Sequence, residues 1–500
     1  MDKTPLNFGA TTTKTRFKFG AEIGKTPLNF GAKLCFNHCI TGLKFMGKIY
    51  FRRKIDEQLD KWLKSEGHSP ALVYGIRQCG KSESIKQFAK NNFKHVNIID
   101  FWKTPSAVSA FDDSLEVDQI IKTLSVMFPS FEFVPNETVL ILDEIQDCPR
   151  ARLAFKSFKE DGRFEVIASG SYIGLNIDNS SGVPKPNGSE DFFEMKTMDF
   201  EEYLWAVGYK DIQINDLLEH FKNKTPIPEA IHNKMKQLFK EYICVSGYPE
   251  AVLKFVQTNS FSEAYKKVSS LVIDIKGDPS KRLDSKGNPL YTSTEIMRIQ
   301  KSFDLIASFV VEDNHRFIIS KINGNSYQRN DALNYLINSS IAFKVYNVEV
   351  PSLPLGIRKI ESDYKLFYAD IGMMINVLGF DTIQGILQDN LGMNKGYLYE
   401  AIVADSLYKS GVPLFYFRKN SGLEIDLVIS YQGFATLVEA KAKTGNTKSS
   451  NQVMNHPEHY GKTKLIKIGD YNISMTDDII TIPHYLTFVL GKDPTTSISR

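Results

Sequence analysis

Three charged side chains interrupt two apolar, β-branched runs in the stretch LEIDLVISYQGFATLVEAKAK, residues 423–443. They are Asp426, Glu439 and Lys441. Alternation along a strand places Glu439 and Lys441 on one face, and a short turn brings Asp426 beside them from the neighbouring run. Two carboxylates can hold Mg²⁺ or Mn²⁺, and an ammonium group can orient water or offset charge during phosphodiester cleavage. A salt bridge at a strand edge is the alternative, and these residues alone leave both open.

The elements that position these side chains are predicted from the residues around them. A helical pattern in NKGYLYEAIVADSLYKSG, residues 394–411, carries Glu400, which could add an outer carboxylate to a metal site. The strand-like runs LFYF, LEIDLVIS and ATLVEAKA follow, and TKLIKIG comes next. The sequence therefore predicts a helix, a three-stranded meander and a further strand around Asp426, Glu439 and Lys441.

A second set of candidate residues lies in the stretch GIRQCGKS, residues 75–82, which satisfies the pattern Gly-x4-Gly-Lys-Ser. A short apolar strand, residues 71–74, precedes it and a helical pattern follows, as a phosphate-binding loop requires. Backbone amides can turn toward phosphate groups, Lys81 supplies charge for the β and γ phosphates, and Ser82 offers a hydroxyl to Mg²⁺. The predicted nucleotide-binding residues of the loop are Gly75, Ile76, Arg77, Gln78, Cys79, Gly80, Lys81 and Ser82.

An apolar strand that ends in acid supplies the partner for that loop. TVLILDEIQD, residues 138–147, places Asp143 and Glu144 at the end of the apolar run. Asp143 would hold Mg²⁺ through water, and Glu144 would orient or deprotonate the attacking water, because phosphoryl transfer depends mainly on positioning and charge. The alternative for the acidic pair is an ordinary helix N-terminus. Ser169, in the run RFEVIASGS, could sense the γ-phosphate, and a capping serine is the alternative.

The order of strands and helices predicts an α/β fold. Strand-like runs alternate with helical patterns between residues 46 and 205, which indicates a parallel sheet covered on both faces. Helical patterns continue to residue 290, with a capping box at Asp199 and Glu202 and an exposed polar connection over residues 276–289. Residues 291–356 have the helix and strand order of a winged helix. Its turn at Tyr327, Gln328, Arg329 and Asn330 would contact DNA, or the helices would serve only for packing.

Composition favours a soluble globular chain of about three or four domains, because 42% of its 500 residues are hydrophobic and 24% are charged. The net charge of +3 gives no general case for nucleic-acid binding, which would need a local basic surface. Five cysteines form no paired CxxC sets, which favours a reducing cytoplasm, and no apolar run reaches membrane-helix length. KTPLNFGA occurs twice before residue 33, and residues 1–45 are predicted to lie outside the fold.

Five stretches together resemble a known family: GIRQCGKS, LILDEIQ, IASGS, MDFEEYLWAVG and SGYPEAV. They are similar to bacterial and archaeal AAA-type ATPases whose C-terminal half carries a restriction-endonuclease-like domain of the PD-(D/E)XK type. The resemblance covers nearly everything after residue 45 and implies ATP and Mg²⁺ as cofactors. Asp426, Glu439 and Lys441 match the nuclease motif. Ile76 stands where the family has proline, and the arginine finger is left unassigned because SSGVPKPNGSED replaces the usual arginine-bearing segment.

The resulting fold prediction is a P-loop NTPase parallel sheet with a helical lid, a winged helix and a C-terminal restriction-endonuclease-like α/β domain. Its boundaries are residues 1–45 for the extension, 46–205 for the ATPase core, 206–290 for the lid and linker, 291–356 for the winged helix and 357–500 for the nuclease-like domain.

Two functional hypotheses follow. The first is a cytoplasmic, ATP-controlled switch or nuclease that acts on nucleic acid, with DNA and a second copy of the chain as candidate partners. The alternative is a non-nucleolytic signalling ATPase whose C-terminal domain binds protein or nucleic acid. The predicted catalytic residues are Glu144, Lys81, Glu439 and Lys441, and the predicted metal ligands are Ser82, Asp143, Asp426, Glu439 and Glu400.

Overall fold

The computed structural model describes residues 43–45, 48–171, 188–282, 287–308, 318–391, 395–443 and 447–495. These residues belong to one compact unit, residues 40–500. The predicted extension, residues 1–45, lies outside the described residues except for strand β1 (Leu43–Phe45), which pairs antiparallel with β2 (Lys48–Tyr50). Among the described residues, no helix has the length and apolar character that crossing a membrane requires.

The first large sheet has five parallel strands in the order β4-β5-β6-β3-β7, which confirms the predicted parallel sheet. Its strands are β3 (Ala71–Tyr74), β4 (His95–Asp100), β5 (Thr138–Asp143), β6 (Glu165–Gly170) and β7 (Asp191–Glu194). Strands β3 and β5 are buried along their whole length, as expected for central strands of a parallel sheet.

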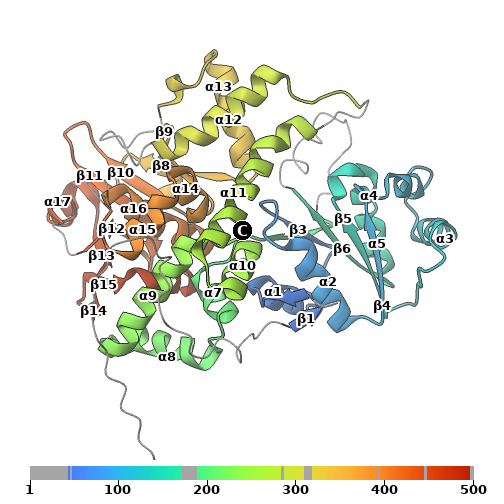
Figure 1. Cartoon of the computed structure of the whole chain (residues 1–500), viewed down its shortest axis with the longest axis horizontal. Coiled ribbons are helices and arrows are strands. Elements are labelled where there is room, and N and C mark those ends of the chain that lie inside the picture. The colour runs from blue at the N-terminus through green and yellow to red at the C-terminus, as the bar shows by residue number, and fades with distance from the viewer. Residues whose placement is uncertain are drawn as a thin grey trace, which may run out of the picture. The chain divides into compact units, whose positions relative to one another are not determined.

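Helices cover both faces of this sheet (Figure 1). Val73, Ile141 and Ile167 face a core that includes α1 (Lys54–Leu63) and α2 (Lys81–Asn92). Side chains of the opposite face, such as Leu72 and Leu140, pack in a separate cluster against the other helices of this part. Those helices are α3 (Val117–Met127), α4 (Pro149–Leu153) and α5 (Phe155–Asp161). The alternation of side chains along each strand therefore produces the two cores.

A run of helices follows the sheet. It contains α7 (Phe200–Ala206), α8 (Asp211–Lys222), α9 (Glu229–Val245), α10 (Pro249–Thr258) and α11 (Phe261–Gly277). The predicted capping box is confirmed, because the Asp199 side chain accepts from the Glu202 amide at 2.9 Å and the Glu202 side chain accepts from the Asp199 amide at 3.1 Å. The predicted exposed connection at residues 276–289 is wrong at its start. Residues 278–281 form the short helix η4, where Asp278 is buried and forms ion pairs with Arg77 and Arg282.

Two further helices, α12 (Ser293–Ser308) and α13 (Ser326–Asn338), precede an antiparallel hairpin of β8 (Ala342–Val348) and β9 (Lys359–Tyr368). Strand β8 also pairs in parallel with β10 (Phe415–Arg418), so the hairpin forms the end of a second sheet. The predicted boundary at residue 356 falls between the two paired strands. The winged-helix assignment stays a prediction.

The second sheet is mixed and has eight strands in the order β14-β15-β13-β12-β11-β10-β8-β9. Its remaining strands are β11 (Glu424–Tyr431), β12 (Phe434–Ala440), β13 (Thr463–Gly469), β14 (Ser474–Met475) and β15 (Ile479–Pro483). Strands β10, β11 and β12 form the predicted antiparallel meander, and β13 then pairs in parallel with β12. The local order predicted around Asp426 and Glu439 is therefore confirmed.

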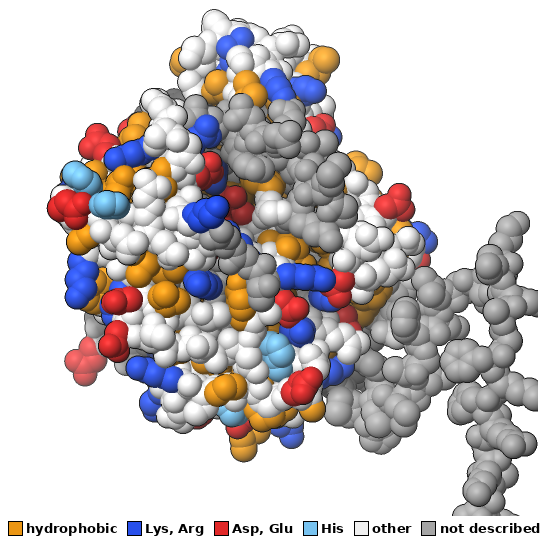
Figure 2. All heavy atoms as spheres, turned by 90° about the vertical axis from the view of Figure 1, so that its left-hand side faces the viewer, with side chains coloured by type: hydrophobic (Ala, Val, Ile, Leu, Met, Phe, Trp, Pro, Cys, Tyr) orange, Lys and Arg blue, Asp and Glu red, His pale blue; other side chains and the backbone are white. Residues whose placement is uncertain are grey.

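Helices pack on both faces of the second sheet. They are α14 (Ile371–Leu378), α16 (Lys395–Lys409), α17 (Lys448–Met454), α18 (Pro457–Tyr460) and η7 (His484–Lys492), whereas α15 (Phe380–Leu387) packs against α9 and α14. Helix α16 contacts β9 and β12, whereas α17 contacts β11 and β13 and contributes Val453 to a separate core. On the face that Figure 2 presents, acidic and basic side chains are interspersed among the described residues. This agrees with the small net charge of the chain.

Candidate nucleotide site and C-terminal carboxylate site

The phosphate-binding loop lies between β3 and α2, as predicted. Gly75 has φ 145° and Gly80, the N-cap of α2, has φ 103°, so the loop uses backbone conformations that favour glycine. A side chain at position 75 would also collide with the Met195 carbonyl oxygen, which lies 2.0 Å from the place of a Cβ atom. The sequence GIRQCGKS therefore forms a tight loop that leads into the N-terminus of a helix, where backbone N–H groups are free for an anion.

Three predicted residues meet where this loop approaches strands β5 and β6, and a fourth, Lys81, bonds within the loop. The Ser82 hydroxyl donates to Oδ1 of Asp143 at 3.1 Å, and the Ser169 hydroxyl donates to the same oxygen. Lys81 Nζ donates to the carbonyl oxygens of Gly75 and Ile76, each at 2.9 Å. Asp143 is 6% exposed. The arrangement thus joins the loop serine, the strand-end aspartate and the serine of the neighbouring strand.

Glu144, the carboxylate predicted to orient or deprotonate the attacking water, has a left-handed backbone with φ 55°, which is uncommon for a residue other than glycine. Its carboxylate accepts from the side-chain amide of Gln146. Burial, together with the nearby charge of Glu144, raises the pKa of Asp147 to about 6. Such a strained backbone beside a site is a recurring feature of functional positions.

The side chain of Arg53 fixes the phosphate-binding loop by hydrogen bonds, and no sequence pattern indicated this residue. Its guanidinium donates to the carbonyl oxygen of Cys79 at 2.6 Å, to that of Lys196 at 2.7 Å and to Glu202 at 3.0 Å. Arg53 is 4% exposed. Because its partners come from three separate segments, this one side chain fixes the loop against β7 and α7.

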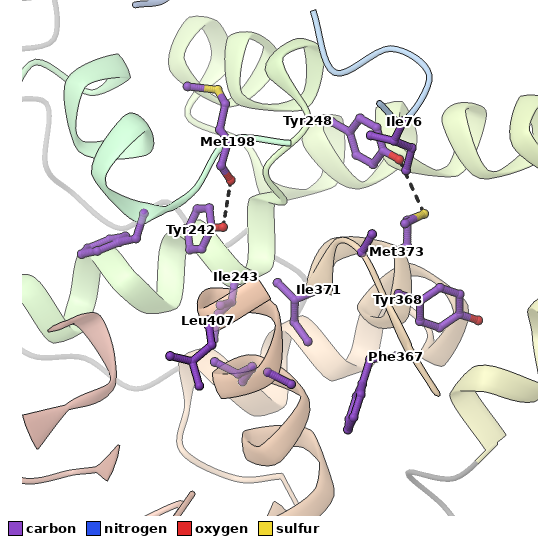
Figure 3. Close-up of a cluster of buried hydrophobic side chains, with 14 of the residues drawn as sticks. Ile76, Met198, Tyr242, Ile243, Tyr248, Phe367, Tyr368, Ile371, Met373 and Leu407 are labelled. Carbon is purple, nitrogen blue, oxygen red and sulfur yellow. Dashed lines mark hydrogen bonds between the residues drawn. The ribbon is translucent and has the colours of Figure 1, made fainter. Parts of the chain in front are cut away.

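Two further contacts tie the loop to later parts of the chain. Arg77 forms an ion pair with Asp278, whose other oxygen accepts from Arg282 at 3.0 Å and from the Tyr335 hydroxyl at 2.8 Å. Figure 3 shows Ile76 beside Tyr248, whose hydroxyl lies 3.6 Å from the sulfur of Met373. Neighbouring residues of the loop are therefore connected to α13 and to α14.

The second candidate site lies on β11 and β12. Lys441 Nζ lies 2.6 Å from Oε2 of Glu439 and 3.8 Å from Oδ2 of Asp426. Asp426 also accepts from the amide of Ala440 at 2.9 Å, and Glu439 accepts from the hydroxyl of Ser450. Burial and the charge of Asp426 raise the pKa of Glu439. The predicted trio is thus brought together, with the lysine between the two carboxylates.

Glu400 lies in a neighbouring group that is organised by a residue absent from the sequence-based set. Lys365, on β9, is 3% exposed and its Nζ lies 2.8 Å from Glu400 and 2.9 Å from Glu424. Burial alone would lower the pKa of Lys365, but these two carboxylates and Asp426 hold it above its ordinary value. Burial raises the pKa of Glu400 to about 7, and Asp426 adds to this although Lys365 opposes it.

The electrostatic influence of Asp426 therefore links the two groups of charges. Within the described residues, no three His, Cys, Asp or Glu side chains are arranged to hold a metal ion. Lysines lie among the carboxylates instead. The assignment of Asp426, Glu439 and Glu400 as metal ligands remains a prediction.

In the predicted DNA-contacting turn, Tyr327 is 79% exposed, whereas Arg329 donates to the carbonyl oxygen of Ile322 at 2.7 Å.

Comparison with protein families assigns part of the chain. Residues 67–204 match a family described as an AAA domain. Residues 236–384 and 395–485 match two families, each described as a domain of unknown function (DUF8612 and DUF4143). The uncharacterized protein MJ1637 of Methanocaldococcus jannaschii is 21% identical over 453 residues, which cover 86% of each chain.

Two solved structures show a partial likeness to this chain. The Walker-type ATPase paby2304 of Pyrococcus abyssi is 14% identical, with a TM-score of 0.36 and coverage of 66% of this chain and 96% of that one. The ORC2 protein of Aeropyrum pernix, in ADPNP-ADP complexes, is 13% identical, with a TM-score of 0.33 and coverage of 71% and 97%.

The AAA match coincides with the parallel sheet, the phosphate-binding loop and the acidic end of β5. Residues 67–204 therefore match the AAA-domain family over the part of the chain that carries the phosphate-binding loop.

Proposed function

We propose that the chain binds ATP with Mg²⁺ and hydrolyses it at the site formed by residues 75–82, Asp143 and Glu144. The observation that carries this proposal is the shared oxygen of Asp143, which accepts from both Ser82 and Ser169. These three oxygens and the amides at the start of α2 match the ligands that Mg²⁺ and phosphate groups use in P-loop proteins.

The residues have separate tasks in this proposal. Ser82 and Asp143 would hold Mg²⁺, which supplies neutralising charge at the phosphates. Lys81 exchanges its bonds to the loop carbonyls for the phosphate oxygens, since ammonium groups bind anions more strongly than neutral carbonyls. Glu144 orients a water molecule and accepts its proton. Arg53 keeps the loop in its binding conformation through the carbonyl of Cys79.

Two substitutions separate binding from hydrolysis. Lys81→Ala is expected to abolish ATP binding, whereas Glu144→Gln is expected to bind ATP normally and hydrolyse it at least 100-fold more slowly. Lys86→Ala, on the same helix outside the loop, serves as the control. Equal hydrolysis by the wild type and Glu144→Gln would show that another residue positions the water.

We further infer that the C-terminal trio acts on the phosphodiester backbone of nucleic acid under control of the nucleotide state. Support comes from the convergence of Asp426, Glu439 and Lys441, whose charged atoms lie 2.6–3.8 Å apart across the lysine. The two carboxylates fit a divalent cation, and the ammonium group fits a role in placing water or offsetting charge. The helices α12 and α13, with the exposed Tyr327, would supply contacts to DNA.

The alternative is a signalling ATPase with a C-terminal binding module. It is favoured by the pairing of Lys441 with Glu439 and of Lys365 with Glu400 and Glu424, because every one of these charges already has a protein partner. A cleavage assay with Mg²⁺ or Mn²⁺, with and without ATP, distinguishes the two functions. Cleavage that disappears in Asp426→Ala supports the nuclease, and its absence in every condition supports the binding module.

A further inference from the structure

A cavity of about 480 Å³ lies between α9 and the segments that follow β12 and β13, and Lys441 of the C-terminal trio is one of its lining residues. Six charged residues line it: Lys236, Lys240, Lys441, Lys443, Asp389 and Asp470. Its volume lies within the range of pockets that hold small ligands. Lysines outnumber aspartates on its walls, and they come from both α9 and the C-terminal sheet. An anionic ligand would therefore contact both parts of the chain.

The two lysines of α9 can exchange their present partners for an anion. Lys236 pairs with Asp470 at 2.8 Å, and Lys240 pairs with Asp389 at 2.6 Å. Both pairs are partly exposed to solvent, and such pairs contribute little to stability. One phosphate group has enough oxygens to bind both ammonium groups at once. In the unbound site, each lysine is paired with its own aspartate instead.

The cavity also has an aromatic lining, made by Phe239 of α9, Tyr399 and His484, and one buried polar atom without a hydrogen-bond partner among the described residues. The Phe239 and His484 rings are stacked with centroids 6.4 Å apart, and the Tyr399 ring lies 4.9 Å from that of His484. Nε2 of His484 is buried and has no hydrogen-bond partner among the described residues. Its ring also bonds to the backbone of Lys441, and burial lowers the pKa of His484 to about 4. A neutral imidazole with one nitrogen engaged in this way leaves the other as an acceptor for a hydroxyl or amino group.

We propose that this pocket binds a nucleoside 5′-phosphate, either free or as the end of a nucleic-acid strand. Lys236 and Lys240 bind the phosphate, and the aromatic lining packs against the sugar or base. His484 Nε2 accepts a hydrogen bond from a ligand hydroxyl or amino group. The site is distinct from the phosphate-binding loop, and the proposal stands whether or not the C-terminal trio cleaves nucleic acid.

Binding of adenosine 5′-monophosphate to the full-length chain tests the proposal by calorimetry. Every arm carries Lys81→Ala, so that the phosphate-binding loop does not contribute. Saturable binding is expected, and adenosine and inorganic phosphate are each expected to bind at least about tenfold more weakly. Competition by a deoxyadenosine hexamer with a 5′-phosphate, compared with a 5′-hydroxyl hexamer, decides whether a strand end or only the free nucleotide enters.

Variants of α9 locate the binding. Lys236→Gln combined with Lys240→Gln is expected to weaken binding by about tenfold or more, because two charged contacts are lost, whereas Lys234→Gln on the same helix is expected to leave it unchanged. If the double variant is unstable, Lys236→Gln combined with Asp470→Asn removes the ammonium charge of Lys236 without leaving its partner Asp470 as an unpaired carboxylate. His484→Phe keeps the ring and is expected to weaken binding severalfold. Absence of saturable binding, or equal affinity in the Lys234 and Lys236/Lys240 variants, would overturn the proposal.

Discussion

The backbone amide of Gly247 donates to Oδ2 of Asp370 at 3.0 Å, which joins the turn between α9 and α10 to the start of α14. Asp370 also accepts from the Ser246 hydroxyl at 2.7 Å and from Lys409 Nζ at 3.0 Å. Lys409, on α16, forms a second ion pair with Asp405 at 3.1 Å. The helices that follow the AAA-domain match and the helices of the second sheet therefore meet at a buried cluster of charged side chains.

Gly247 is expected to tolerate no side chain at this junction. A Cβ atom would lie 2.3 Å from the Met198 carbonyl oxygen and 2.8 Å from Oδ2 of Asp370. Gly247→Ala should therefore lower the free energy of unfolding by about 3 kcal/mol, the upper part of the range for overpacked cores. Urea denaturation measures the change. Gly277→Ala is the control, because nothing lies within 4 Å of its Cβ position and alanine favours helix. An equal effect of both substitutions would contradict the predicted clash.

Asp405 is expected to make stability depend on pH. Burial raises its pKa to about 7 from an ordinary 3.8, although Lys409 opposes the shift. The folded chain therefore retains a proton on Asp405 that the unfolded chain loses between pH 4 and 7, so this contribution to stability falls as pH rises across that window. Asp405→Asn has no ionisable group at this position, so it removes this loss of stability at rising pH. Its free energy of unfolding relative to wild type should rise by roughly 2–4 kcal/mol from pH 4 to 7 and level off above. A difference independent of pH would argue against this titration.

Arg53 is expected to support both stability and nucleotide binding. Lysine cannot reproduce its contacts with Cys79, Lys196 and Glu202, because an ammonium group lacks the planar fork of a guanidinium. Arg53→Lys should lower the free energy of unfolding by about 2–3 kcal/mol and weaken ATP binding. Arg52→Lys is the matched control, since Arg52 is paired at the surface with Glu57 and Asp211. Thermal unfolding with and without ATP tests both effects. Similar results for the two variants would show that Arg53 contributes no more than the surface residue Arg52.

Local patterns predicted the parts of the fold that local chemistry decides. The loop of residues 75–82, the acidic strand end at Asp143 and the capping box at Asp199 all depend on neighbours within a few residues. The meander of β10, β11 and β12 could also be predicted from the sequence, because alternation and short turns specify antiparallel neighbours.

The buried charged residues that support the two candidate sites, such as Arg53 and Lys365, could not be predicted from local patterns. Arg53 and Glu202 are 149 residues apart, and Lys365 and Glu400 are 35 apart. A lone lysine or arginine in a sequence is expected at the surface, and it is buried only when a distant carboxylate meets it. The parallel pairing of β8 with β10 has the same origin, since a contact between distant segments leaves no periodic signal.

Lys441 lies between the carboxylates of Asp426 and Glu439. In a metal site, Lys441 competes with the cation for Glu439, because its Nζ lies 2.6 Å from that carboxylate. Lys441→Met should therefore strengthen Mn²⁺ binding while it slows or abolishes cleavage, whereas Asp426→Ala and Glu439→Ala should weaken the binding. Without metal, Lys441→Met should lower stability through repulsion between Asp426 and Glu439, and saturating Mn²⁺ should restore it.

A purely structural ion pair predicts a different set of results for the same variants. Without metal, adding Asp426→Asn to Lys441→Met recovers the lost stability under either hypothesis, because one of the two repelling charges is removed, so the response to Mn²⁺ has to separate them. If the ion pair is purely structural, Mn²⁺ would change neither the melting temperature nor the calorimetric signal of any variant. Measuring both quantities for the wild type, the three single variants and the double variant decides between the readings. Restoration by Mn²⁺ in Lys441→Met, lost again on adding Asp426→Asn, identifies the carboxylates as cation ligands.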